Sequence, residues 1–160
     1  MDAHIPSLQI LLRILFALLL GFIVGLEREA KNKPAGLRTN MLVCLGAAAF
    51  TLLALEIHYS MVDLRERVTS DPMRVLNGIM EGLGFLGAGC IIQSRGSVEG
   101  ITTAATIWVV GAIGLACGAG RFGIAILTTV LAFLVLTALR FVEARLKQPT
   151  VGPKTDAERE

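Results

Sequence analysis

The sequence predicts an all-α membrane protein, a bundle of about five transmembrane helices. Its residues are 54% hydrophobic and its mean hydropathy is +0.68, whereas a soluble domain is roughly 45–50% apolar. Charged residues make up 18% of the chain and fall in short blocks between long apolar runs. These runs are close to the ~20 residues that a helix needs to cross the hydrocarbon. We expect one transmembrane domain over residues 1–142 and a polar, disordered tail over residues 143–160.

Each apolar run predicts one span. The expected spans are Leu8–Leu26, Met41–Leu55 (with Leu37 as the alternative start), Val75–Ile92, Ile101–Ala119 and Phe122–Val142. Gly21 and Gly25 give the first span a small face that a neighbouring helix can approach. Asp71 before Pro72 predicts an N-cap that starts the third span. The second span is short, so a four-span arrangement with a re-entrant second segment is the alternative.

The distribution of basic residues predicts the orientation. Lys and Arg are more frequent on the side of the first loop, the third loop and the tail than on the other side. The positive-inside rule therefore places the N-terminus outside and the C-terminus in the cytoplasm. The loop before Asp71 fits this orientation least well, because it carries basic residues although it would lie on the outer side.

The sequence predicts a buried polar group in the spans, made of Arg13, Asn77 and Glu81. Arg13 and Glu81 each lie five or six residues from the outer end of a span, which is about 8–9 Å deep. Such residues usually face the bundle interior, so we predict that the two side chains pair or share a polar cavity. The alternative is that Arg13 snorkels to the surface and Glu81 is protonated. Asn77 lies one helical turn from Glu81, on the same face.

The third span is rich in glycine, and two interpretations compete. Its glycines are Gly78, Gly82, Gly84, Gly87 and Gly89. In the first interpretation the glycines form a close-packed interface, within the bundle or between protomers. The best candidates for a self-association face are Gly78, Gly82 and Gly111. Otherwise the helix is broken here and its freed carbonyls line an ion path.

Charged residues also gather at the predicted cytoplasmic face. They are Glu27, Arg28, Glu29, Arg38, Arg95, Glu99 and Arg140. They are either solvated anchors at helix ends or an ion-paired lid over the cytoplasmic loops.

Several functional classes are poorly supported. The sequence has no G-x-S-x-G, H-E-x-x-H or Walker A motif, so we expect no enzyme activity. The net charge of +2 is too small to indicate nucleic-acid binding. Cys44, Cys90 and Cys117 lie in apolar runs and are expected to be packing residues. No cofactor is predicted. Mg²⁺ is the one candidate ion, although a lone carboxylate at Glu81 makes a poor site.

Four ordered segments closely resemble the MgtC/SapB family of bacterial inner-membrane proteins. They are GLEREAKNKPAGLRTNMLVCLGAAAF (Gly25–Phe50), DPMRV (Asp71–Val75), GLGFLGAG (Gly82–Gly89) and GITTAATIWVVGAIGLACGAG (Gly100–Gly120). The resemblance covers nearly all of residues 8–142. The family's characteristic positions correspond to Glu27, Arg28, Gly36, Arg38, Thr39, Asp71, Pro72, Arg74, Gly84, Gly87, Gly89, Thr102 and Thr103.

The resemblance implies a multi-pass inner-membrane protein linked to growth in low magnesium and to survival inside host macrophages. It implies regulation of other membrane proteins, including the F-type ATP synthase, with direct cation transport as the alternative. Longer family members carry a C-terminal soluble domain, which we do not expect in this chain. Many members have a glutamine at the position of Gly78 and a small residue at that of Glu81, so we expect Glu81 to be particular to this chain.

Overall fold

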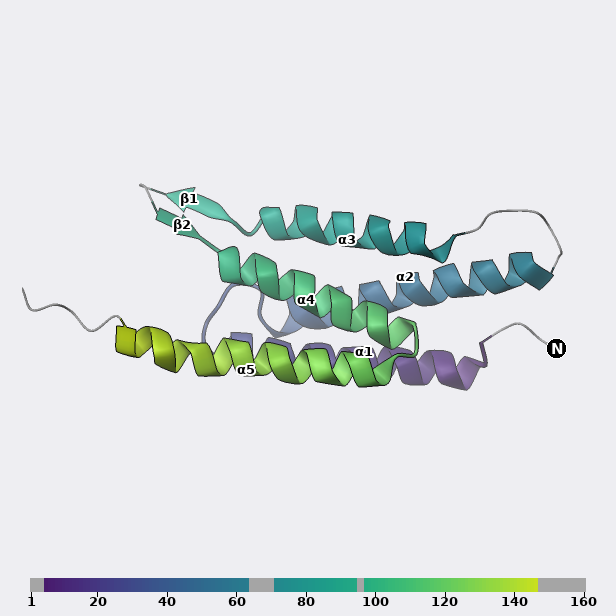
Figure 1. The fold of residues 1–160 in the computed structure, drawn as a ribbon, viewed down its shortest axis with the longest axis horizontal. Coiled ribbons are helices and arrows are strands. Elements are labelled where there is room, and N and C mark those ends of the chain that lie inside the picture. Colours follow the sequence, from purple (N-terminus) through teal and green to yellow (C-terminus); the bar gives the residue numbers. More distant parts are fainter. Residues whose placement is uncertain (1–4, 64–70, 95–96, 147–160) are drawn as a thin grey trace, which may run out of the picture.

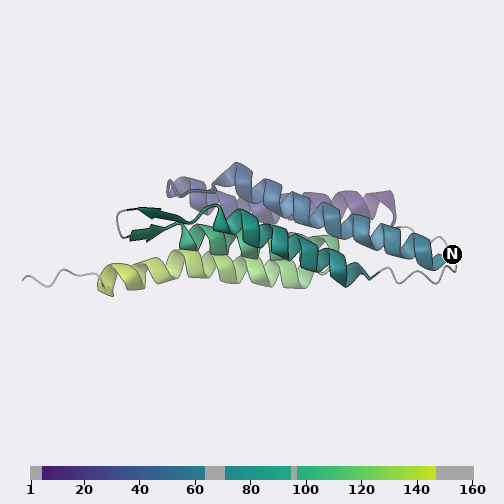
Figure 2. The ribbon, with the colours of Figure 1, turned by 90° about the horizontal axis from the view of Figure 1, so that it is seen from above.

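The computed structural model describes residues 5–63, 71–94 and 97–146. In these ranges the chain forms an elongated bundle of five helices with one two-stranded antiparallel hairpin (Figures 1 and 2). The elements in order are α1 (Ser7–Ala30), α2 (Leu37–Asp63), α3 (Pro72–Ala88), β1 (Ile92–Ser94), β2 (Ser97–Glu99), α4 (Ile101–Gly118) and α5 (Phe122–Leu146). The helices follow one long axis, and the hairpin projects at the end where α1 leads into α2.

Three of these helices have the length and hydropathy of a membrane span. Among the described residues they are α1, the Leu37–Met61 part of α2, and α4, while α5 contributes a shorter apolar stretch, Phe122–Ala138. The expected helical bundle is confirmed, but α3 is only 17 residues long and is not among these three helices. Helix α2 continues for 27 residues, which contradicts the re-entrant alternative.

Helix α3 begins as predicted and ends earlier than predicted. The Asp71 carboxylate accepts a hydrogen bond from the Met73 amide at 2.9 Å, and Pro72 occupies the first turn. The helix ends at Ala88, and the chain turns into the hairpin, which pairs Gln93 with Val98. The expected span through Ile92 and the expected loop after it were therefore wrong. Glycine near the end of α3 lowers helix stability, which favours this early stop.

Small and aliphatic side chains form the core between α1, α2 and α4. Its buried members include Ala17 and Val24 of α1, Cys44 and Ala48 of α2, and Val110, Ile113 and Cys117 of α4. Glycines on α1 and on α4 allow each of these helices to pack closely against α2. A Cβ on Gly21 would lie 2.9 Å from Cys44 Cβ, and one on Gly114 would lie 2.3 Å from the Cys44 carbonyl oxygen. The predicted small face of α1 is thus confirmed at Gly21 and at Gly25, where a Cβ would lie 2.9 Å from Leu37 Cα.

Arg13 has a different partner from the one predicted. Its Nη1 donates to the carbonyl oxygen of Gly118 at 2.8 Å, and its guanidinium lies beside Gly120, whose φ is +71°. Carbonyls at the C-terminus of a helix lack partners within the helix, and a basic side chain there also favours the helix dipole. Arg13 therefore caps α4 and joins it to α1.

Glu81 and Asn77 are exposed on α3 rather than enclosed in the bundle. No ion pair joins Glu81 to Arg13. The pairing prediction was wrong because hydropathy gave the depth of each residue but not the direction in which its helix faces. Gly111 is also not a self-association residue, since a Cβ there would lie 2.1 Å from Leu83 Cδ1 of the same chain.

A candidate functional site at the end of the bundle

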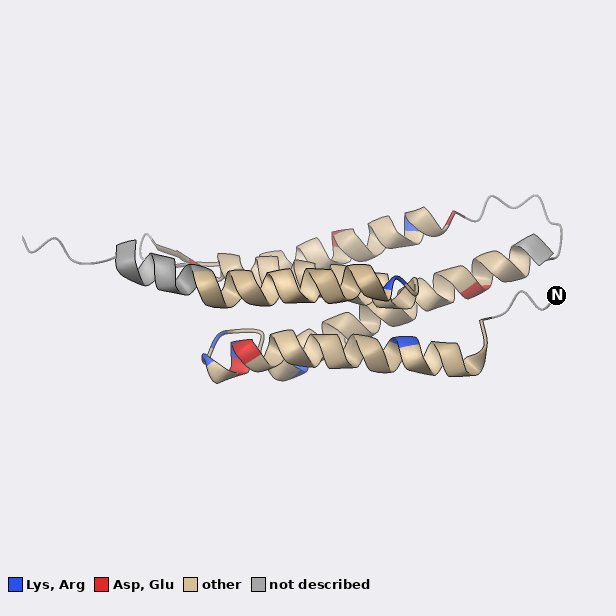
Figure 3. Cartoon of the chain, turned by 60° about the horizontal axis from the view of Figure 1, so that its bottom comes forward, with Lys and Arg blue, Asp and Glu red and all other residues tan. Residues whose placement is uncertain are grey.

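Buried polar side chains gather where α1 leads into α2. We call this set, which consists of Glu27, Arg28, Lys31, Asn40 and Thr103, the polar cluster. Figure 3 shows acidic and basic residues concentrated at this end of α1. Because buried charges are costly unless they are paired, this is the part of the described bundle where polar chemistry is concentrated.

Arg28 connects α1 to α4 and to the loop before α2. It is 3% exposed, and its Nη2 donates to Thr103 Oγ1 at 2.6 Å and to the Pro34 carbonyl oxygen at 3.0 Å. Its Nε is buried and has no hydrogen-bond partner within the described residues. One guanidinium thus joins the end of α1 to the nearby loop and to α4, which lies 75 residues further along the chain.

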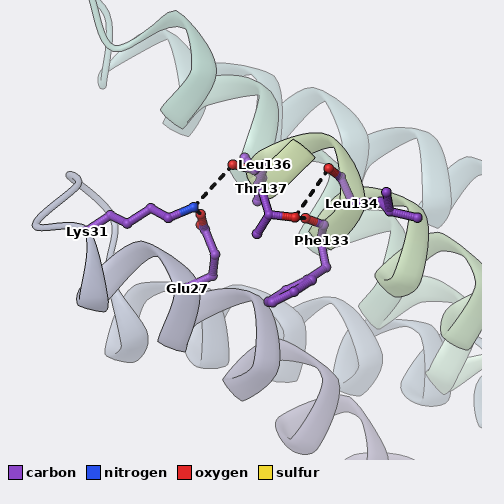
Figure 4. Close-up of polar contacts among 6 residues, drawn as sticks. All are labelled: Glu27, Lys31, Phe133, Leu134, Leu136 and Thr137. Atoms are coloured by element: carbon purple, nitrogen blue, oxygen red, sulfur yellow. Dashed lines mark hydrogen bonds and ion pairs between the residues drawn. The ribbon is translucent and has the colours of Figure 1, made fainter. Parts of the chain in front are cut away.

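Glu27 and Lys31 connect α1 to α5. Lys31 Nζ forms an ion pair with Glu27 Oε1 and also donates to the Leu136 carbonyl oxygen at 3.3 Å (Figure 4). The Glu27 side chain is 4% exposed. Its second oxygen, Oε2, is buried without a hydrogen-bond partner in the described ranges.

Asn40 completes the cluster from α2. Its Nδ2 donates to the carbonyl oxygens of Ala35 at 2.6 Å and Gly36 at 2.8 Å, which fixes the orientation of the amide. Asn40 is fully buried, and its Oδ1 has no hydrogen-bond partner in the described part of the chain. Sequence reasoning missed Asn40. The available signal was an amide directly before the second apolar run, four residues after Gly36.

Glu29 supports the cluster from outside. Its Oε2 accepts a hydrogen bond from the Leu37 amide at 3.0 Å and so caps the start of α2. A Cβ on Gly36 would lie 2.0 Å from this same oxygen. Gly36 therefore leaves the space that the capping carboxylate occupies, which gives this predicted family position a structural role.

The structure separates the predicted site residues into groups. Arg28 hydrogen bonds to Thr103, and Glu27 pairs with Lys31, which was not among the residues of the lid interpretation. Arg38 and Thr102 are exposed, and Thr39 is half-buried. Arg95 and the side chain of Arg140 lie outside the described residues.

The remaining predicted residues belong to α3. Asp71 and Arg74 lie at its start, at the opposite end of the bundle from the polar cluster (Figure 1). Gly87 is buried against Ala104 of α4, where a Cβ would make ordinary contact at 3.5 Å. Gly84 faces open space, and Gly89 ends the helix. Close packing of the glycine motif is thus confirmed at Gly87 and not at Gly84.

Some hydrogen-bonding atoms of the polar cluster have no partner among the described residues. Two acceptor oxygens, Glu27 Oε2 and Asn40 Oδ1, and one donor, Arg28 Nε, are buried and unpartnered within the described residues. An unmet buried hydrogen-bonding group costs about 1–3 kcal/mol. Such groups favour uptake of water or of a small polar species. In the described ranges, no group of three or more His, Cys, Asp and Glu side chains is arranged to hold a metal ion.

Together, the helical bundle and its polar end define a membrane protein whose buried charges fix loops at one end. The sequence model of the MgtC family matches residues 14–145, and this chain belongs to that family.

Three relatives illustrate the similarity. The protein MgtC of Salmonella paratyphi A is 35% identical over 156 residues, which are 98% of this chain and 63% of that protein. An uncharacterized protein of Haemophilus influenzae is 38% identical over 80% of this chain and 53% of its own length. The putative magnesium transporter YhiD of Escherichia coli K12 is 34% identical over 86% of this chain and 64% of its own length. This chain thus spans less than two thirds of each relative. No solved structure matches it.

Proposed function

We propose that this chain is a multi-pass protein of the bacterial inner membrane that supports growth when Mg²⁺ is scarce by binding and regulating other membrane proteins. Membership of the MgtC family and the name of one relative, a putative magnesium transporter, support the link to magnesium. The observation that carries the regulatory part is the tightly packed apolar core between α1, α2 and α4.

This core leaves little space for an ion between its helices. Val24, Cys44 and Ile113 are fully buried there. Gly114 and Gly118 lie so close to α2 that a Cβ on either would fall within 2.6 Å of a backbone oxygen. Interiors packed to this density resist opening, since even one added methylene is felt. A rigid bundle is suited to acting through its outer surface.

The proposed orientation places the N-terminus outside and the C-terminus in the cytoplasm. The polar cluster then lies near the cytoplasmic face, because α1 ends there. The division proposed from the sequence, at residues 142 and 143, falls within α5, which continues to Leu146, so residues 143–146 of the expected disordered tail are helical. Among partners, the family resemblance implies the F-type ATP synthase, and self-association is the other candidate.

Cation transport is the second candidate. Glu27 Oε2 and Asn40 Oδ1 favour it, because buried, unpartnered oxygens are the ligand type that Mg²⁺ takes. One relative is named a putative magnesium transporter. In this alternative the polar cluster would be the cytoplasmic end of a route.

Two assays on the same preparation separate these functions. The chain is expected to restore low-Mg²⁺ growth to a host strain that lacks its own copy, and to give no Mg²⁺ uptake above that of empty vesicles when purified into proteoliposomes. A saturable Mg²⁺ flux that Glu27→Gln abolishes and Glu81→Gln leaves intact would overturn the regulatory proposal. Glu81→Gln is the matched control because Glu81 is an exposed carboxylate outside the cluster.

A further inference from the structure

Two arginines meet at the turn between α4 and α5. Arg13 Nη1 donates to the Gly118 carbonyl oxygen at 2.8 Å, and a Cβ on Gly120 would lie 2.9 Å from Arg13 Nη2. Arg121 follows Gly120 directly, and consecutive Cα atoms are about 3.8 Å apart. Arg121 is exposed, whereas Arg13 is half-buried. The two arginines thus belong to one small region of the surface.

The positive charge of this pair is not neutralised within the described residues. Arginine is always charged in proteins. The contact with Gly118 uses one N–H group of Arg13 and a neutral acceptor, and neither arginine forms an ion pair with a described acidic side chain. Neighbouring positive charges repel each other, and an anion that contacts both removes this repulsion. Charge complementarity therefore indicates an anionic occupant.

Apolar surface continues on both sides of the pair along the bundle axis. Helix α1 begins six residues before Arg13, about 9 Å away, and extends past the turn between α4 and α5 (Figure 1). Its Leu8 and Leu12 are exposed in this extension. In the other direction, Ile124 and Leu131 are exposed on α5. Water solvates an arginine but not these aliphatic side chains, so the surface fits an amphiphile with an anionic head and apolar chains.

The level of the pair matches the boundary of the hydrocarbon. Helix α4 has the length and hydropathy of a membrane span. Its 18 residues extend about 27 Å, close to the ~30 Å thickness of the hydrocarbon. Arg13 contacts Gly118, the last residue of this helix. The guanidinium groups therefore lie where the hydrocarbon ends and the phosphate groups of the lipids begin.

We propose that Arg13 and Arg121 bind the phosphate of an anionic phospholipid whose acyl chains lie along the exposed apolar side of α5. Guanidinium N–H groups match the geometry of phosphate oxygens. The Gly118 carbonyl already orients Arg13, which lowers the entropy lost on binding. A zwitterionic lipid fits less well, because its ammonium group brings a third positive charge. This site is independent of whether the chain regulates or transports.

Native mass spectrometry of the purified full chain in detergent tests the ligand. The chain is titrated with phosphatidylglycerol and with phosphatidylethanolamine of the same acyl chains. Phosphatidylglycerol is expected to bind about 30-fold more tightly, since each of two basic residues contributes ~1 kcal/mol toward an anionic lipid. In a third arm, inorganic phosphate at the concentration of the lipid is expected to displace none of it, because it lacks the chains that contact α5.

Four variants locate the site. Arg121→Gln is expected to weaken phosphatidylglycerol binding about fivefold, whereas Arg121→Lys keeps the charge and should retain most of the affinity. The matched controls are Arg74→Gln, at the same end of the bundle, and Arg38→Gln, at the other end. Both of these arginines are exposed, so each control removes one exposed positive charge and should leave the affinity unchanged. Thermal unfolding checks that each variant is folded.

Each contrary outcome overturns a stated part of the proposal. Equal affinities of the unmodified chain for the two lipids would overturn the anionic ligand, whatever the variants do. Displacement of the lipid by inorganic phosphate would show that the acyl chains are not recognised, and would overturn the assignment to a phospholipid. Losses in Arg74→Gln or Arg38→Gln equal to that in Arg121→Gln would show general attraction to positive charge, and would overturn the location.

Discussion

Thr103→Val tests whether the polar cluster holds the bundle together. The substitution preserves shape but removes the oxygen that accepts from Arg28 Nη2 at 2.6 Å. Arg28 is 3% exposed, so water does not readily replace this contact. Hydrogen bonds to charged groups contribute about 1.5–3 kcal/mol. We expect a loss of about 2 kcal/mol in unfolding free energy, which for a chain of this size lowers Tm by about 4–8 °C.

The measurement is thermal unfolding of the purified protein in detergent. The fluorescence of Trp108, which is the single tryptophan and lies on α4 with Thr103, reports on the helix that Arg28 holds. Thr102→Val is the control, because this neighbouring threonine is exposed and its hydroxyl lies outside the cluster. Tm should change by less than about 1–2 °C there. Equal Tm values for the two variants would refute the assignment of Arg28 to a stabilising contact with Thr103.

Three further predictions use the same assay. Gly114→Ala should lower Tm strongly, because its Cβ would clash with the α2 backbone at 2.3 Å. The control Gly123→Ala should leave Tm unchanged or raise it, because it removes a flexible glycine. Similar Tm changes in the two variants would contradict the packing described. Gly36→Ala should cost about 1 kcal/mol by displacing the carboxylate that caps α2, and an unchanged Tm would show that the cap is dispensable. Glu81→Gln should leave Tm in detergent unchanged, whereas Arg13→Gln should lower it. In a double-mutant cycle the two effects should add. A coupling energy above about 0.5 kcal/mol would show that Arg13 and Glu81 interact after all.

Features coded by neighbouring residues were predictable from the sequence. Asp71 followed by Pro72 specified the start of α3, because an N-cap uses groups only two residues apart. The apolar runs specified the helices of the bundle, because backbone groups in hydrocarbon must be satisfied within the helix. The residue at which α3 ends was harder to predict from the sequence, because the hairpin that follows depends on pairing between β1 and β2.

The candidate site was only partly predictable. Glu27 and Arg28 were expected at a common membrane face, and Thr103 was expected only as a family position; the structure joins Arg28 to Thr103. Asn40 and Lys31 were not expected. Asn40 lies between the charged loop and the second apolar run, and its partners are backbone carbonyls. Lys31 lies in the charged loop, one helical turn after its partner Glu27.

The sequence by itself determined that this is a helical membrane protein of the MgtC family and which residues lie near each end of its helices. Only the tertiary structure decided which way those residues face. A helix that is apolar on all sides gives no signal of its rotation about its own axis. The structure alone therefore turned Arg13 toward Gly118, buried Glu27 and left Glu81 exposed on α3. The rotation of each helix is set by the packing of its glycines against the backbone of a neighbouring helix. These contacts join residues that are far apart in the chain.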